Sequence, residues 1–163
     1  MQSRGFILEV AMIKERLLEL GLELPQAVPS LYQYVPVVVH QGIAYISGQV
    51  PRVDGNIPYV GKVGQDVTIE QAQELARICV LRGLSCLEAE IGSLDRVERV
   101  LKITGYVQSG AGFSQQPQVM DAASELLMQI FGEKGRHART AVGVAELPVN
   151  TPVEIDFMIA VKS

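Results

Sequence analysis

The sequence predicts an α+β protein in which one layer is a sheet of antiparallel strands and the other is a pair of helices. The predicted elements run helix, strand, strand, helix, strand, helix, strand, strand along the 163 residues. Because the strands do not alternate regularly with helices, this order favours a layered sheet over a doubly wound one. Hydrophobic residues make up 48% of the chain, which is enough for one sizeable core.

The first predicted element is an amphipathic helix over residues 8–21. Apolar residues recur there at three- and four-residue steps, with charged residues between them. These apolar residues are Val10, Ile13, Leu17 and Leu20. Gly21 is expected to follow the last turn, and the prolines of the next segment make that segment a connector.

Residues 34–50 are predicted to form a β-hairpin. Two runs rich in β-branched and aromatic residues are joined there by a short turn that contains glycine. Pro36 cannot donate a ladder hydrogen bond, so the first run is expected at a sheet edge or beside a bulge. Residues 51–66 contain several turn-forming glycines and are predicted to be a long loop.

Two further helices are predicted, at about residues 69–91 and 119–131. Thr68 and Gln71 form a capping-box pattern before the first of them, and small residues on its apolar face indicate close packing on the sheet. The second is expected to end at Gly132. A segment over residues 110–117 before it is predicted to be a loop.

The remaining strands complete the predicted sheet. A third strand is expected within residues 97–107, and residues 138–161 are predicted to form a second hairpin. Two helices cover only one face of such a sheet. We therefore expect the other face to be buried against further subunits in closed cyclic symmetry.

The overall charge argues against several classes of partner. The net charge is −4 and no run of Lys or Arg forms a phosphate-binding stripe, so we do not expect a nucleic-acid partner. The beginning of the sequence lacks the uninterrupted apolar region of a signal peptide, and no apolar run is long enough to cross a membrane. A cytoplasmic location is therefore expected.

The cysteines and histidines do not suggest a metal site. Cys79 and Cys86 lie about 10 Å apart along one predicted helix, which is too far for a disulfide, so both are expected to be buried thiols. His40 and His137 are distant in sequence, and no Cys/His cluster has the spacing of a zinc site. We expect neither a metal nor an organic cofactor.

The last predicted hairpin holds two polar residues in unusual places. Arg139 begins a strand of small apolar residues, and Glu154 lies inside the strand sequence VEIDF. An arginine can bind a carboxylate or phosphate through two parallel hydrogen bonds, and a glutamate can move a proton to or from water. The residues alone leave open a plain alternative, which is a strand-end ion pair between Arg139 and Glu154.

A resemblance to a known family connects these residues. The segment HARTAVGVAELPVNTPVEIDFMIAV resembles the C-terminal signature of the YjgF/Rid family of imine and enamine deaminases, which also carry the label endoribonuclease L-PSP. Further similarities lie in the segment AYISGQVP, in the helix at 69–87 and in the strand that ends GYV. The resemblance covers residues 34–161. It implies a chorismate-mutase-like sheet backed by two helices and assembled as a homotrimer with clefts between subunits.

The resemblance also implies roles for individual residues. Arg139 would bind the substrate carboxylate, and Glu154 would help to activate the hydrolytic water. The other implied substrate-binding residues are Tyr34, Ser47, Gly48 and Ala141, the last standing where the family often has Cys. Each has a structural alternative: the tyrosine as a core cap, the serine as the partner of a strand-end amide, and the glycine at a bulge.

Several segments depart from the shorter members of this family and resemble a longer branch. They are the N-terminal helix, the loop at 51–66, and the segments GAGFSQQPQVMD and GEKGRHART. We divide the chain into an N-terminal helix and connector, residues 1–30, and a family-like domain, residues 31–163. His137, two residues before the arginine, is either an acid or base of the pocket or a histidine at the entry to a strand.

The function that the resemblance implies is hydrolysis of reactive 2-imino or enamine acids to 2-keto acids and ammonia. The partners would be a small carboxylate-bearing imine or enamine and two further copies of the chain, with no nucleic acid and no membrane. One alternative is a non-catalytic trimer that binds a metabolite carboxylate. Another is an endoribonuclease, against which the acidic charge balance argues.

Overall fold

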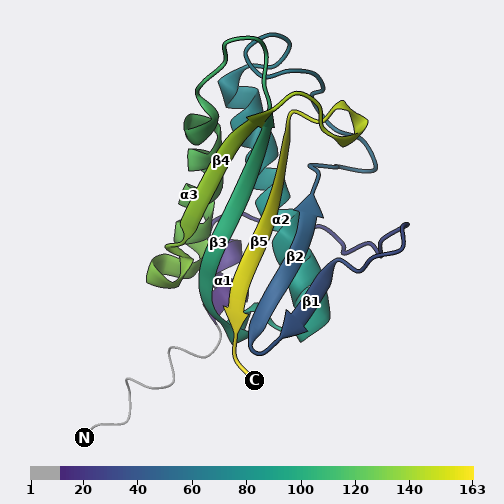
Figure 1. Cartoon of the computed structure of the whole chain (residues 1–163). Helices are drawn as coiled ribbons and strands as arrows, with labels where there is room; N and C mark the ends of the chain where they lie inside the picture. Colours follow the sequence, from purple (N-terminus) through teal and green to yellow (C-terminus); the bar gives the residue numbers. More distant parts are fainter. Residues whose placement is uncertain (1–11) are drawn as a thin grey trace, which may run out of the picture.

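The computed structural model of the chain describes residues 12–163. Its helices are α1 (Met12–Glu19), α2 (Ile69–Ile91) and α3 (Gln116–Phe131), with short 3-10 helices η1 (Leu94–Arg96), η2 (Gly132–Gly135) and η3 (Pro148–Asn150). Its strands are β1 (Val37–His40), β2 (Ile43–Gln49), β3 (Val97–Gln108), β4 (Ala138–Val144) and β5 (Val153–Val161). Within these residues the strands form one sheet in the order β1-β2-β5-β3-β4 (Figure 1).

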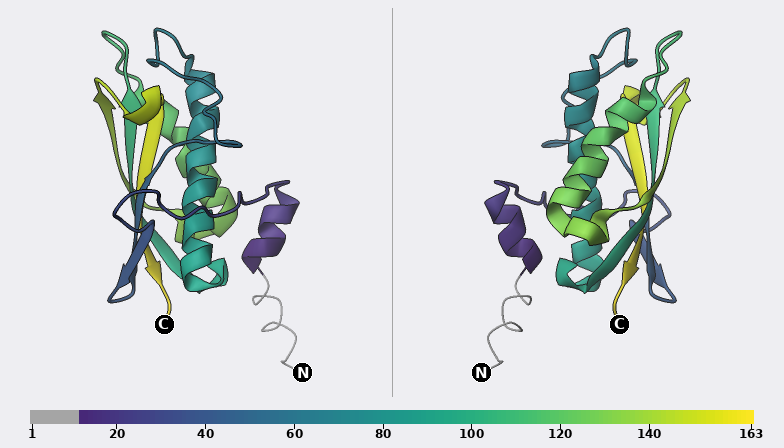
Figure 2. Two further views of the ribbon diagram at one scale, coloured as in Figure 1. Left: turned by 90° about the vertical axis from the view of Figure 1, so that its right-hand side faces the viewer. Right: turned by 90° about the vertical axis from the view of Figure 1, so that its left-hand side faces the viewer.

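The sheet and the helices form two layers. Helices α2 and α3 lie side by side against one face of the sheet, and within residues 12–163 no helix covers the other face (Figure 2). The burial pattern of strand β5 agrees with one covered face. Its odd-numbered residues from Val153 to Val161 are buried, and the even-numbered residues between them are only partly buried. The α+β prediction of a sheet backed by two helices is confirmed.

Helix α2 has the bounds that its capping residues predict. The Thr68 side chain accepts a hydrogen bond from the Gln71 amide, and the Gln71 side chain accepts one from the Thr68 amide. Gly92 ends the helix with a positive φ of 88°, which a glycine adopts without strain. Gly83 faces the sheet, where an added Cβ would lie 2.6 Å from the Phe157 ring, so this glycine allows close packing.

The prediction of a C-terminal hairpin is wrong. Strand β4 lies at the sheet edge and pairs in parallel with β3, whereas β5 lies between β2 and β3 and is antiparallel to both. The sheet is therefore mixed rather than wholly antiparallel. Sequence neighbourhood favours β4 beside β5, but β3 pairs with β5 along most of its length and separates the two strands.

Two helix starts differ from the predictions or lie partly beyond the described residues. Helix α3 begins at Gln116 rather than at Val119, because a proline is tolerated in the first turn of a helix, where its missing amide has no partner to bond. Of the helix predicted over 8–21, the structure shows Met12–Glu19, and residues 8–11 lie outside the described part. Residue Gly21 has the positive φ, 68°, expected after a helix end.

The N-terminal helix packs on the domain, and the predicted hairpin forms over Val37–Gln49, a little shorter than the predicted 34–50. Leu17 of α1 is buried, and the Arg16 side chain donates to the Gln129 carbonyl of α3 at 2.7 Å. Strand β1 is an edge strand that starts directly after Pro36, and a two-residue turn at Gln41 and Gly42 leads into β2. None of the helices within residues 12–163 has the length and apolar character to cross a membrane.

Candidate functional site

Arg139 lies on the helix-covered side of the sheet. It pairs with Ile103 in the parallel β3–β4 ladder, and its guanidinium reaches helix α3. There Nη1 donates to the Asp121 carboxylate at 2.9 Å and to the Ser124 hydroxyl at 3.2 Å. About a quarter of the side chain is exposed, so the guanidinium is positioned by α3 and still reaches solvent.

His137 supports this arrangement as a neutral side chain. Its Nδ1 lies 2.6 Å from the Gly135 carbonyl, which can only accept, so Nδ1 carries the proton. Nε2 then accepts from the Ser124 hydroxyl at 2.9 Å, and the same hydroxyl accepts from Arg139. Burial lowers the pKa of His137, and the nearby positive charge of Arg139 lowers it further. The histidine therefore orients Ser124 and Arg139.

Glu154 lies on the opposite, uncovered face of the sheet. It alternates along β5 with the buried residues Val153 and Ile155 and pairs across the ladder with Tyr106. Its carboxylate lies against Gly48, where an added Cβ would be 2.6 Å from Oε1. Burial raises the pKa of Glu154, and the negative charge of Asp156 raises it further. Glu154 is thus an acid that retains its proton more strongly than an ordinary glutamate.

Ser47 and Tyr34 meet where the connector enters the sheet. The Ser47 hydroxyl donates to the Val35 carbonyl at 2.9 Å, so it satisfies a carbonyl rather than the amide that the structural alternative named. The Tyr34 ring is half exposed and stacks on Tyr32, with 6.2 Å between ring centroids, so it does not cap the core. Gly48 lies in the irregular stretch between Ile46 and Gln49, where the β2–β5 register shifts, as its bulge alternative predicted.

The structure brings some of the predicted residues together and separates others. Ser47, Gly48 and Glu154 form one group on the uncovered face. Arg139 lies across the sheet from them, and the alternative ion pair between Arg139 and Glu154 does not form, because Arg139 pairs with Asp121 instead. Ala141 is partly buried and packs toward the core on the Arg139 side.

The sequence reasoning missed four polar residues of these two groups. Asp121 and Ser124 are three residues apart on α3, a spacing that places both on one helix face. Asp156 is two residues from Glu154 and so shares its face of β5. Tyr106 donates through its hydroxyl to Asp156 at 2.9 Å. Strand alternation could have identified Asp156, but nothing in the sequence connects Asp121 with Arg139.

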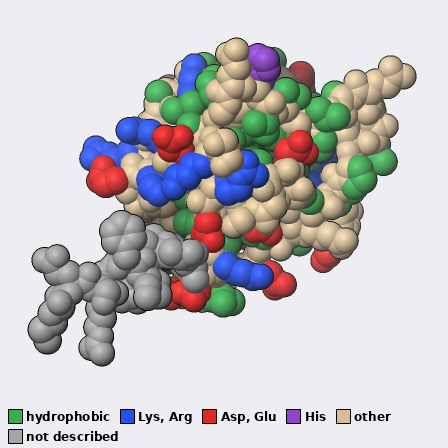
Figure 3. Space-filling view, turned by 90° about the horizontal axis from the view of Figure 1, so that it is seen from below, with side chains coloured by type: hydrophobic (Ala, Val, Ile, Leu, Met, Phe, Trp, Pro, Cys, Tyr) green, Lys and Arg blue, Asp and Glu red, His purple; other side chains and the backbone are tan. Residues whose placement is uncertain are grey.

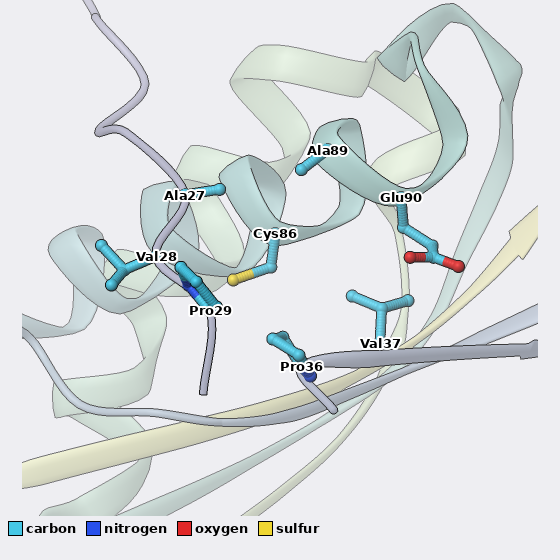
Figure 4. Close-up of a pocket in the computed structure, with 8 residues that line it drawn as sticks. All are labelled: Ala27, Val28, Pro29, Pro36, Val37, Cys86, Ala89 and Glu90. Carbon is cyan, nitrogen blue, oxygen red and sulfur yellow. The ribbon is translucent and has the colours of Figure 1, made fainter. Parts of the chain in front are cut away.

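Two hollows also lie on the surface of the molecule, and one of them borders His137. One lies between the connector and α2, where Cys86 points between Pro29 and Pro36 (Figure 4), and its lining contains Glu90 but no basic residue. The other is shallow and is lined in part by Arg99, Arg136 and Glu133. Seen from below, Lys and Arg side chains gather with acidic ones over one part of the surface (Figure 3).

Metal binding and thiol chemistry each place requirements on the His, Cys, Asp and Glu side chains of the described residues. Within residues 12–163 no group of three His, Cys, Asp or Glu side chains is placed to hold a metal ion. Cys79 and Cys86 are free thiols, the first buried and the second only partly buried, which corrects the expectation that both are buried. Burial raises the pKa of each thiol and so disfavours the reactive thiolate.

Comparison with known proteins places this arrangement in a family. The chain is 38% identical to Protein TCP17 of Trypanosoma cruzi over 152 residues, covering 93% of this chain and 95% of that one. The crystal structure of the protein Atu1372 of Agrobacterium tumefaciens is 41% identical, with a TM-score of 0.85 and 92% of each chain covered. A Shewanella oneidensis structure titled a "putative endoribonuclease" is 29% identical, with a TM-score of 0.88 over 92% of this chain and 99% of that one.

Residues 14–160 match the family described as "YjgF/chorismate_mutase-like, putative endoribonuclease". The match spans both groups of polar residues, the two helices and all five strands that the described residues form. The chain therefore belongs to the YjgF/chorismate-mutase-like family.

Proposed function

We propose that the protein hydrolyses 2-imino and enamine acids to 2-keto acids and ammonia, in a cleft between subunits of a homotrimer. The observation that carries the proposal is the placement of Arg139 and Glu154. One is a positioned cation and the other a half-buried acid, and they lie on opposite faces of a single sheet. A carboxylate-bearing substrate could touch both only if they came from different copies of the chain.

The uncovered face of the sheet supports such an assembly. It presents apolar side chains, among them Tyr45 and Val142, each roughly two-fifths exposed. Closed cyclic symmetry would bury this face and would repeat one interface around the ring. The proposal further requires that Arg139, which lies on the edge strand β4, reach Glu154 of the next copy across this interface. Trimeric assembly is part of the proposal and is the arrangement that the family resemblance implies.

The proposed reaction needs one acid that also acts as a base. Glu154 gives its proton to the imine nitrogen, and its carboxylate then takes a proton from water as the water oxygen bonds to the imine carbon. A second proton transfer from Glu154 to nitrogen breaks the carbon–nitrogen bond and releases ammonia. The hydroxyl proton returns to Glu154 as the keto group forms, so the acid is regenerated. An enamine takes this first proton from Glu154 at carbon instead of nitrogen, which gives the same protonated imine, and the later steps are unchanged.

Arg139 would hold the substrate carboxylate in this sequence. A planar guanidinium suits bidentate recognition of a carboxylate, and Nη1 is already fixed by α3. Ser47, Gly48, Tyr34 and Ala141 would form the remaining walls of the cleft, and the missing side chain of Gly48 leaves room for the Glu154 carboxylate. Positioning and electrostatics would supply most of the acceleration, because a protonated imine is already electrophilic.

Subunit mixing tests the proposal. R139A and E154Q chains, each inactive alone toward enzymatically generated 2-aminoacrylate, are coexpressed with different tags and purified as mixed oligomers. If each cleft takes its arginine and glutamate from neighbouring copies, every mixed trimer has one intact cleft in three, so about one third of the clefts are restored. Recovery of keto-acid release at that level is expected. No recovery in mixed trimers would contradict the shared cleft, because a site within one chain would remain broken in every subunit.

The alternatives give different results with the same proteins. If the wild-type protein releases no keto acid from several imino acids, deamination is excluded. Binding of pyruvate, measured by calorimetry and lost in R139A, would then support a carboxylate-binding trimer. RNA cleavage that survives stringent purification and disappears in R139A would instead support an endoribonuclease.

A further inference from the structure

The uncovered face carries a second carboxylate close to Glu154. Asp156 is two residues along β5, on the same face, which separates the two Cα atoms by about 7 Å. Both side chains are partly buried. Two carboxylates in this position resist ionising together, because each negative charge disfavours the other.

The hydrogen bond of Tyr106 distinguishes the two carboxylates. It pairs with Glu154 across the β3–β5 ladder, yet its hydroxyl donates to Asp156, at 2.9 Å. A donated hydrogen bond stabilises the ionised form of its acceptor. The carboxylate of Glu154 instead lies against Gly48, which has no side chain to donate.

The surrounding charges reinforce this difference. On the neighbouring strand β2 the Ser47 hydroxyl donates to the Val35 carbonyl. From behind the sheet, α2 contributes Cys79, a neutral buried thiol, and Arg82, whose hydrogen bond is to the Arg52 carbonyl. Within residues 12–163 no Lys or Arg forms an ion pair with Glu154.

The cations Lys102 and Arg99 of β3 lie farther along the same face, beside Met158 and Ala160 of β5. Lys102 of β3 is exposed and pairs with Met158, which is two residues beyond Asp156 and four beyond Glu154. Any favourable interaction with these charges is therefore felt more by Asp156 than by Glu154. On β4 the residues opposite, Thr140 and Val142, are uncharged.

We propose that Asp156, held ionised by the Tyr106 hydroxyl, is a positioning residue that keeps the proton on Glu154, so that Glu154 begins the reaction as an acid. This inference rests on the proposed function, which needs a protonated glutamate to give its proton to the imine nitrogen. Asp156 does not touch the substrate in this scheme. The direction of the Glu154 pKa, raised by burial and then by Asp156, agrees with the geometry.

The test measures the protonation of Glu154 directly. Carboxyl groups of ¹³C-labelled protein are titrated by NMR, and the Glu154 signal is assigned by its loss in E154Q. Asp156→Asn and Tyr106→Phe are each expected to lower the Glu154 pKa, the aspartate variant more. Glu98→Gln removes an exposed charge from β3 and is the matched control, which should leave the Glu154 pKa unchanged. A Glu154 titration that is the same in D156N as in wild type would overturn the inference.

Activity gives a second readout. If protonated Glu154 starts the reaction, kcat falls as the pH rises through its pKa, and D156N moves that fall to lower pH. We expect D156N to lose on the order of threefold to tenfold in kcat at a pH above the wild-type Glu154 pKa, and little at a pH below the Glu154 pKa of the variant. A uniform loss at both pH values would indicate a structural role and count against the inference. If the titration shifts but no deaminase activity is found, the acid pair stands and the proposed function fails.

Discussion

The two polar groups of this protein sit on opposite faces of one sheet and are built in opposite ways. Around Arg139 the charge is matched, because Asp121, Ser124 and, through Ser124, His137 satisfy the guanidinium from helix α3 and the β4 entry. Around Glu154 the charge is not matched. That carboxyl is half-buried beside Asp156 and against the bare backbone of Gly48. One face holds a stable cation, and the other disfavours an anion.

This difference indicates what each face can contribute to a reaction. A cation held by its neighbours is fixed in place before the substrate arrives, which suits recognition of a carboxylate. An acid whose pKa is raised keeps its proton to a higher pH than an ordinary glutamate does, which suits proton donation. Substitutions on either face can separate these two contributions.

Replacing Arg139 should cause the largest loss. In R139A the substrate carboxylate loses its charged partner, and kcat/KM toward 2-aminoacrylate should fall by about a hundredfold or more. R139K keeps the charge but loses the planar fork, so its kcat/KM should lie between those of R139A and wild type. Steady-state kinetics with circular dichroism as a fold control measure this. Equal kcat/KM for R139A and wild type would show that the carboxylate is bound elsewhere.

A methyl group at Gly48 should displace the acid. The Gly48 backbone permits alanine, but the new Cβ would lie 2.6 Å from Glu154 Oε1, so the carboxyl must move. A misplaced catalytic group typically costs one to two orders of magnitude, and we expect about a tenfold drop in kcat for G48A. In a double-mutant cycle G48A should add nothing to E154Q. Additive losses would mean that Gly48 acts independently of the acid.

Loosening the support of Arg139 should have a smaller effect. D121N removes the ion pair with Arg139 but leaves Ser124 in place, so KM should rise about threefold with little change in kcat, as expected for a partly exposed pair. Glu125 lies one turn of α3 away, is exposed and forms none of the ion pairs found within residues 12–163, which makes E125Q the matched control. A similar KM change in both variants would indicate a general effect of surface charge.

The smallest predicted effect is on stability. Because the folded state raises the pKa of Glu154, it holds a proton that the unfolded chain has released at intermediate pH. The free energy of unfolding therefore decreases as the pH rises from the ordinary carboxyl pKa to the raised one. At pH 8 the Tm of E154Q should be about 1–2 °C above that of wild type. At pH 4 the two proteins should have the same Tm. A lower Tm for E154Q at pH 8 would mean that the ionised carboxylate stabilises the fold.

Local patterns predicted most of the elements but not their pairing. Helix α2 was predicted over the range observed, because its capping box and its terminal glycine are short-range signals. The β4–β5 hairpin was predicted wrongly. The residue patterns of β4 and β5 are compatible with several neighbouring strands, and β3 can pair along either of its edges.

The candidate site divides in the same way. Arg139 and Glu154 stand out as polar residues in apolar strands, and Asp156 shares the face of Glu154 by simple alternation. Which face each strand turns toward the helices depends on register across three strands. That register placed Arg139 beside α3 and Glu154 away from it, and so replaced the supposed ion pair between them.

Residue type and local spacing were enough to indicate the family and the two layers, and they singled out Arg139 and Glu154 as candidates for a chemical role. The tertiary structure alone decided that β5 inserts between β2 and β3 and that Arg139 and Glu154 face opposite ways. The physical reason is that strand pairing is a long-range competition among ladders of similar hydrogen bonds. Packing of Val153, Ile155 and Phe157 against the helices settles that competition, and it leaves Glu154 on the other face.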